Sequence, residues 1–116
     1  MVIPTPLPGL AAVTLYYDTW FDKITKNHVE ILGREDEIRL VVSSPTAVCI
    51  ASSNPSYRVF INDSVRSPGG QSLLTVYVDP LPGVVVSAYY NRSFPRLGLG
   101  RIIWQPSAST PSPRRR

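Results

Sequence analysis

The stretch from Tyr57 to Tyr90 constrains the fold more than any other part of the chain. It contains three runs rich in β-branched and aromatic residues, at 57–62, 72–78 and 83–90. Clusters of Pro, Gly, Asp and Ser separate these runs, a pattern typical of consecutive β-strands with short connections. The third run is apolar on both faces as far as Ser87, which indicates a strand in the middle of a core.

The proline and glycine content favours the same fold class. The 116 residues include twelve prolines and seven glycines, far more than a helical bundle tolerates. A chain of this length forms one domain and can bury a core without help from a metal or a disulfide. We therefore predict an all-β fold: a single antiparallel β-sandwich, or a small barrel, of about seven or eight short strands.

Further short apolar runs supply the other predicted strands, at 10–17, 28–32, 37–43, 46–52 and 101–105. In 28–32 and 37–43, apolar and charged residues alternate on either side of a polar turn. This pattern predicts a hairpin with one solvent-exposed face. Residues 18–27 fit either a short helix or an irregular loop. The helix would turn three apolar side chains inward, those of Trp20, Phe21 and Ile24.

The two ends of the chain differ from the predicted domain, 10–105. Residues 1–9 carry prolines at every second position, Pro4, Pro6 and Pro8. Because proline fixes the backbone and removes a donor, we expect an extended assembly arm that lies along its own domain or reaches across to a neighbour. Residues 106–116 are small, polar and proline-rich and end in three arginines, which predicts a solvated basic tail.

Positive charge is concentrated in the second half of the chain. The net charge is +4, with −2 in residues 1–56 and +6 in residues 57–116, and no acidic residue follows Pro80. The basic residues of the last third are Arg92, Arg96, Arg101, Arg114, Arg115 and Arg116. Aromatic residues are interleaved with them: Tyr89, Tyr90, Phe94 and Trp104. Such a set could grip phosphates and stack on bases. Alternatively, the aromatic residues belong to the core or an interface, and the tail serves solubility or meets an acidic protein surface.

Few residues are suited to catalysis. His28 is the only histidine and Cys49 the only cysteine, so a multi-histidine metal site is excluded. Cys49 stands in an apolar run, where we expect a buried, inert thiol. The three acids at 35–37 are expected at a solvated hairpin tip rather than around a cation. We therefore expect neither an enzyme nor a cofactor.

The sequence also lacks the usual membrane and export signals. No run of 18 apolar residues is present, so we expect no membrane span. The apolar start of the chain has no basic region and contains prolines, so we expect no ordinary signal peptide. A cytoplasmic or virion-associated location follows as an expectation.

One family resemblance covers about a third of the chain. The run 57–62, the Leu-Pro-Gly turn 81–83 and the apolar strand 84–91 follow one another as in the middle of a fibronectin type III or related immunoglobulin-like domain. The chain departs from that pattern where the family places an aromatic residue after the turn, since valines stand there. The resemblance implies a sandwich used for adhesion or assembly rather than catalysis.

Three functional hypotheses follow. The first is a non-enzymatic structural or protein-interaction module, one subunit of a larger assembly such as a virus or phage particle, whose partners are other subunits or further copies of itself. The second is a small basic protein that binds nucleic acid through the arginine-rich last third. The third is a β-sandwich that binds a ligand or glycan on exposed aromatic rings.

Overall fold

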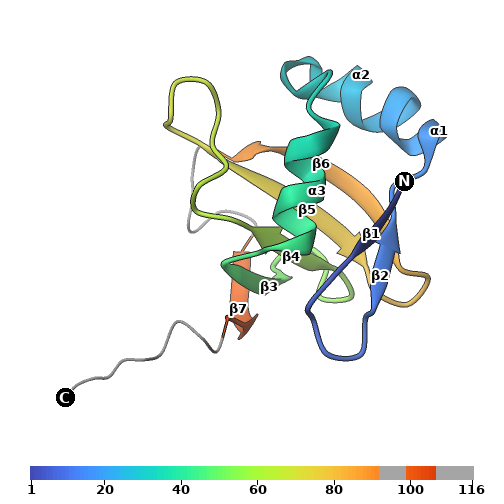
Figure 1. Ribbon diagram of the computed structural model, residues 1–116, viewed down its shortest axis with the longest axis vertical. Coiled ribbons are helices and arrows are strands. Elements are labelled where there is room, and N and C mark those ends of the chain that lie inside the picture. Colours follow the sequence, from blue (N-terminus) through green and yellow to red (C-terminus); the bar gives the residue numbers. More distant parts are fainter. Residues whose placement is uncertain (92–98, 107–116) are drawn as a thin grey trace.

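The computed structural model describes residues 1–91 and 99–106. In this part of the chain seven strands form one curled sheet, a half-barrel, and a helix lies across one of its faces (Figure 1). The strands are β1 (Val2–Pro4), β2 (Ala12–Thr14), β3 (Ala47–Ala51), β4 (Arg58–Ile61), β5 (Leu73–Asp79), β6 (Val84–Asn91) and β7 (Leu99–Trp104). Their order across the sheet is β1-β2-β6-β5-β4-β3-β7.

Most of the predicted strands are confirmed. The strands β3, β4, β5, β6 and β7 correspond to the predicted runs, and β5 and β6 form the longest antiparallel pair. The turn between them closes where Gly83 donates its N–H to the Asp79 carbonyl at 3.0 Å. Gly83 has a φ of +73°, a left-handed conformation that a residue without a Cβ adopts at no cost. The mostly β character that the sequence predicts is therefore correct.

The sheet is single, and a sandwich of two packed sheets is not what the described residues form. A helix, α3 (Glu35–Ser43), takes the place of a second sheet over one face (Figure 1). The sheet is also not wholly antiparallel, because β2 meets β6 in parallel through the pair Thr14 and Val84. The half-barrel stays closer to the predicted small barrel than to the sandwich.

The predicted hairpin of 28–32 and 37–43 is wrong. The first run forms a single helical turn, η2 (Val29–Ile31), and the second forms α3. In α3 the buried residues are Ile38, Val41 and Val42, the spacing of one helical face and not of a strand. The acids at 35–37 fill the first helical turn, where carboxylates stabilise the positive end of the helix dipole.

The segment that fitted either a helix or a loop is helical. Three consecutive pieces, α1 (Tyr17–Thr19), η1 (Trp20–Ile24) and α2 (Thr25–Asn27), run without a break. The middle piece is π-helical, since the Thr25 N–H donates to the Trp20 carbonyl five residues back. Trp20 and Ile24 are buried as expected, whereas Phe21 is 42% exposed.

The N-terminal residues lie along their own domain, one of the two placements that the sequence left open. β1 pairs antiparallel with β2, so Pro4 lies opposite Ala12 at the edge of the sheet. Ile3 is completely buried in the main core. Pro6 and Pro8 belong to the connection between the two strands. Of the predicted basic tail, 106–116, residues 107–116 lie outside the described residues.

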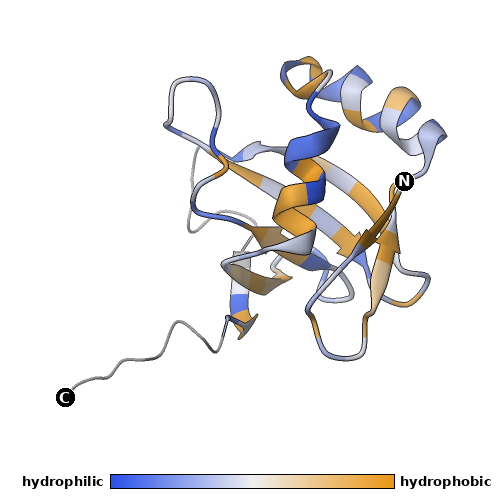
Figure 2. Cartoon of the chain, viewed as in Figure 1, coloured by the Kyte–Doolittle hydropathy of each residue, from blue (hydrophilic) through white to orange (hydrophobic). Residues whose placement is uncertain are grey.

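Two apolar clusters occupy the two faces of the sheet. The main core lies between the sheet and the helices and includes Phe60, Leu74, Val76 and Ile38. A second cluster uses the alternate residues of the same strands, among them Val59, Leu73 and Tyr77. Figure 2 shows the central strands as mostly hydrophobic and the first turn of α3 as hydrophilic. Because β4 and β5 bury side chains on both faces, each face offers a place for a site.

Candidate functional site

The aromatic and basic residues that the sequence grouped together do not form one surface. Tyr89 belongs to the second cluster, whereas Tyr90 and Trp104 pack against the main core on the other face. Arg101 is exposed on β7. The remaining members of the predicted set, Arg92, Phe94, Arg96, Arg114, Arg115 and Arg116, lie outside the described residues. The structure therefore separates Tyr89 from Tyr90 and Trp104.

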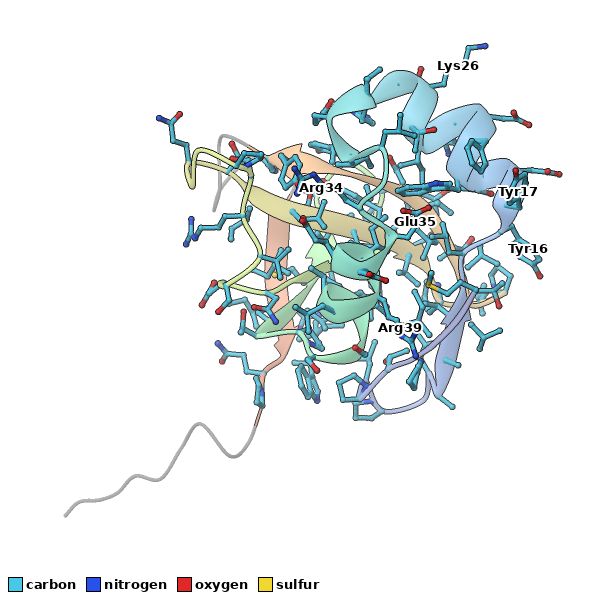
Figure 3. The ribbon with its side chains drawn as sticks, turned by 45° about the horizontal axis from the view of Figure 1, so that its top comes forward. Tyr16, Tyr17, Lys26, Arg34, Glu35 and Arg39 are labelled. Atoms are coloured by element: carbon cyan, nitrogen blue, oxygen red, sulfur yellow. The ribbon has the colours of Figure 1, made fainter. Side chains whose placement is uncertain are left out.

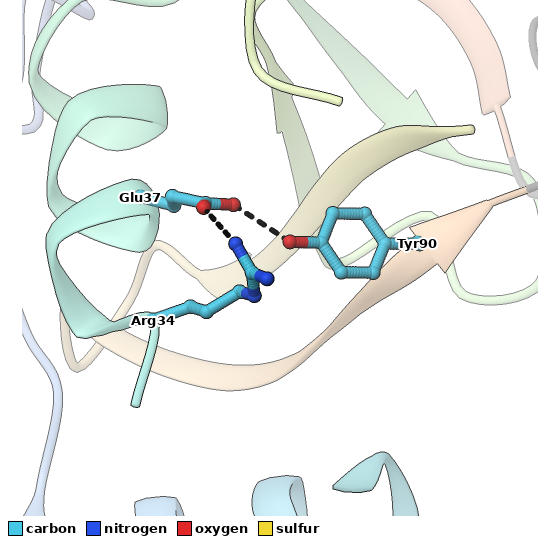
Figure 4. Close-up of polar contacts among 3 residues, drawn as sticks. All are labelled: Arg34, Glu37 and Tyr90. Atoms are coloured by element: carbon cyan, nitrogen blue, oxygen red, sulfur yellow. Dashed lines mark hydrogen bonds and ion pairs between the residues drawn. The ribbon is translucent and has the colours of Figure 1, made fainter. Parts of the chain in front are cut away.

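Tyr90 takes part in a polar contact that joins β6 to α3 (Figure 4). Its hydroxyl donates to Glu37 Oε1 at 2.7 Å, and Arg34 donates from a guanidinium nitrogen to Glu37 Oε2, also at 2.7 Å. Burial, followed by the hydrogen bond to the Glu37 carboxylate, raises the pKa of Tyr90 to about 12. Because each carboxylate oxygen already has a donor, this cluster stabilises the helix against the sheet.

A cavity of about 240 Å³ opens on the opposite face, and we call it the tyrosine pocket. Its floor consists of residues from β5 and β6, namely Tyr77, Val86, Ser87 and Tyr89. Its walls come from η1 and from the connection between β3 and β4, with Lys23, Ser53, Asn54 and Tyr57. Pockets for drug-sized ligands measure roughly 300–1,000 Å³, so this one suits a single ring-sized group.

Three rings follow one another beside this pocket. The rings of Tyr77 and Tyr89 lie within 11° of parallel with centroids 5.7 Å apart, and their hydroxyls are hydrogen-bonded at 3.0 Å. His28 stacks on Tyr89 at 5.1 Å. Burial, followed by the hydrogen bond to Tyr89, raises the pKa of Tyr77, so its phenol stays neutral. The result is a rigid aromatic wall with hydroxyl groups at its edge.

Lys23 is a cation at the edge of this aromatic wall. It belongs to η1, the π-helical turn, and its side chain is exposed. Single π-helical turns occur frequently at functional sites. Asn54 faces it from the β3–β4 connection, where its Oδ1 already accepts the Ser56 N–H at 3.0 Å. The pocket thus combines aromatic surface, an amide whose NH₂ group can donate, and a cation.

The sequence named only one member of this pocket, Tyr89. Tyr57 and Tyr77 carried a signal, because each alternates onto one face of a predicted strand. Lys23 and Asn54 carried none, since only the packing of η1 and of the β3–β4 connection beside β6 brings them to the pocket. Residues from three separate segments therefore meet here.

Cys49 and His28, the only cysteine and the only histidine, lie in different surroundings. Cys49 is 2% exposed, and burial raises the pKa of its thiol. His28 has Nδ1 3.8 Å from Glu30 Oε2 and stacks on Tyr89. Over residues 1–91 and 99–106, no group of three His, Cys, Asp or Glu side chains could hold a metal ion.

A second cavity, of about 270 Å³, lies beside the N-terminus, and we call it the aromatic groove. Its lining residues are Met1, Leu15, Tyr17, Trp20, Phe21 and Glu35. Trp20 is 3% exposed, and its Nε1 is buried without a hydrogen-bond partner among the described residues. Such an unpaired donor costs about 1–3 kcal/mol. This side of the groove therefore lacks an acceptor for the indole N–H.

Comparisons with known proteins found no match for the chain. No protein-family model matches it, and no curated protein or solved structure is significantly similar to it. Among the described residues, no helix is long and apolar enough to cross a membrane. The case for a function therefore rests on the two cavities and on the charge of the chain.

Proposed function

We propose that this protein binds single-stranded nucleic acid and holds one base in the tyrosine pocket. The observation that carries this proposal is a cavity that three tyrosine rings, Tyr57, Tyr77 and Tyr89, line together with Lys23. Base stacking on aromatic side chains with a cation nearby for the backbone is how proteins grip single strands without reading their sequence. The pocket volume of about 240 Å³ fits one base rather than a longer ligand.

The charge distribution supports the same partner. Residues 57–116 carry a net charge of +6, and Arg92 and Arg96 follow Tyr89 closely in the sequence. A phosphate backbone attracts such a basic chain, whereas a neutral sugar, which could also stack on tyrosine, gains nothing from the charge. The charge therefore favours nucleic acid over a glycan, the third of the hypotheses drawn from the sequence.

Fluorescence anisotropy with a labelled single-stranded oligonucleotide tests the proposal. We expect Tyr57→Leu to weaken binding roughly tenfold, because its ring lines the pocket and one stacked base contributes about 1–3 kcal/mol. The matched control is Tyr16→Leu, since Tyr16 is 56% exposed and does not line the pocket. Equal affinity of the wild type and Tyr57→Leu would overturn the proposal. Saturable binding of a neutral oligosaccharide without any oligonucleotide binding would do the same.

The salt dependence of the affinity tests the role of Lys23. Each phosphate contact on a single strand contributes roughly 0.7 to the slope of log affinity against log salt. We expect Lys23→Gln to lower the slope by about this amount. Lys26→Gln, in the same helical stretch but outside the pocket, should leave the slope unchanged. Identical slopes for both variants would remove Lys23 from the site.

A second function, that of a subunit in an assembly, has an observation of its own. The aromatic groove is bordered by large apolar side chains that stay exposed: Met1, Val2, Tyr16, Tyr17 and Phe21. Several exposed apolar side chains beside one cavity are typical of a surface that contacts another protein. This patch supports the assembly hypothesis independently of the tyrosine pocket.

A further inference from the structure

We infer that the aromatic groove is a docking site for the C-terminal segment 106–116 of a second copy of this chain. The inference rests on the second proposed function, self-assembly, and does not require nucleic-acid binding. Three features carry it: the exposed rings at the groove, a carboxylate inside it, and the chemistry and starting point of the segment.

The groove presents aromatic surface without a cover among the described residues. Tyr17 is 74% and Phe21 42% exposed, and their rings lie 4.5 Å apart. Trp20 forms a buried wall whose indole N–H has no partner in the described part of the chain. Aromatic grooves of this kind bind proline-rich segments, which are already extended and so lose little entropy on docking.

The groove also carries uncompensated negative charge. Glu35 lines it from the first turn of α3, on the side where Tyr16 and Tyr17 lie (Figure 3). Its carboxylate makes no ion pair or hydrogen bond with the described residues. The neighbouring helical stretch adds no net charge, because Asp18 and Asp22 are balanced by two lysines. The N-terminal amino group of Met1, which also lines the groove, already donates to the Leu15 carbonyl at 2.9 Å. The Glu35 carboxylate thus attracts a basic partner.

The C-terminal segment has the matching chemistry. Its sequence, PSASTPSPRRR, contains three prolines, ends in three arginines and has no acidic residue. The prolines would lie on the rings of Tyr17 and Phe21. An arginine would then meet the Glu35 carboxylate, an ion pair that the planar guanidinium makes with two hydrogen bonds. No other stretch of the chain combines prolines with three adjacent arginines.

The topology favours a second copy over the same chain. The groove begins at Met1, next to β1, which forms one edge of the sheet, and the segment leaves from β7, which forms the opposite edge. Each copy therefore offers a groove at one edge and a segment at the other. A contact of this head-to-tail kind uses two different surfaces, so successive copies form a ring or an open row.

Sedimentation of nuclease-treated full-length protein over a range of concentrations tests the inference. We expect the mean mass to rise with concentration, and an added peptide of residues 106–116 to lower it again. Replacing all three terminal arginines by alanine should weaken association about tenfold. Tyr17→Ser should have a similar effect, and Glu35→Gln should weaken it about fivefold. The matched controls are Leu81→Ser, at an apolar residue that is 94% exposed, and Asp63→Asn, at an exposed acid outside the groove.

Each result bears on the inference. A monomer at all concentrations would overturn it, and so would a segment that docks on its own chain, seen as peptide binding without any change in mass. Association that survives the triple alanine variant would keep self-assembly but remove the segment as the occupant. Because circular dichroism of the triple alanine variant checks that the fold is unchanged, a loss of association there cannot be attributed to misfolding.

Discussion

The hydroxyl of Tyr90 donates to the Glu37 carboxylate at 2.7 Å across a sequence separation of 53 residues. This contact fixes the start of α3 against β6, and Arg34 completes it from the other side of the carboxylate (Figure 4). It explains why Tyr90, which the sequence placed among the interaction aromatics, faces the helix and not the tyrosine pocket.

Tyr90→Phe tests the strength of this contact. We expect the free energy of unfolding to fall by about 1 kcal/mol, because a partly exposed hydrogen bond to a charged group is lost while the ring still packs. Urea denaturation measures the change. Tyr16→Phe is the control, since its exposed hydroxyl has no partner among the described residues; a loss as large there would show that the effect does not come from the Glu37 contact.

The same tyrosine predicts how stability depends on alkaline pH. The pKa of Tyr90 is about 12 in the folded protein, against a value of 10.0 for an ordinary tyrosine. Between these values the unfolded chain loses the proton while the folded protein keeps it, so stability falls as pH rises through this window. Tyr90→Phe should show a smaller fall from pH 10 to 12. Parallel curves for wild type and variant would contradict this assignment.

Gly100 tests the pairing of β7 with β3. A Cβ atom at this position would lie 2.6 Å from the Ile50 carbonyl oxygen, a distance that the backbone cannot accept without moving. We expect Gly100→Ala to lower the free energy of unfolding by about 1–3 kcal/mol. Gly69→Ala, where a Cβ meets nothing within 4 Å, should change it by less than about 0.5 kcal/mol. Equal urea midpoints for both variants would place β7 elsewhere.

We expect the thiol of Cys49 to be unreactive in the folded protein. It is 2% exposed, and burial raises the pKa of its thiol, so little thiolate is present at neutral pH. We expect a chromogenic disulfide reagent to react with it only after unfolding in guanidinium. Fast reaction with the native protein would mean that β3 opens readily to solvent.

The sequence by itself determined the strands β3 to β7, the turn at Gly83 and the burial of Cys49. These depend on neighbours along the chain: β-branched residues between turn formers extend, whatever they later pack against. Hydrophobic alternation also assigned Tyr57 and Tyr77 each to one face of its own strand, although their meeting with each other and with Tyr89 was not foreseen. The charge division between the two halves is likewise a property of the sequence alone.

Only the tertiary structure decided the rest. Residues 37–43 contain both an alternating and a helical pattern, and the helix prevails because Ile38, Val41 and Val42 together cover the sheet. Lys23 reaches the tyrosine pocket because η1 packs beside β6. Tyr90 and Tyr89 lie on opposite faces of the sheet because adjacent residues of a strand point in opposite directions. A site assembled from distant segments has no signal in any one of them, since it exists only once the chain has closed around its core.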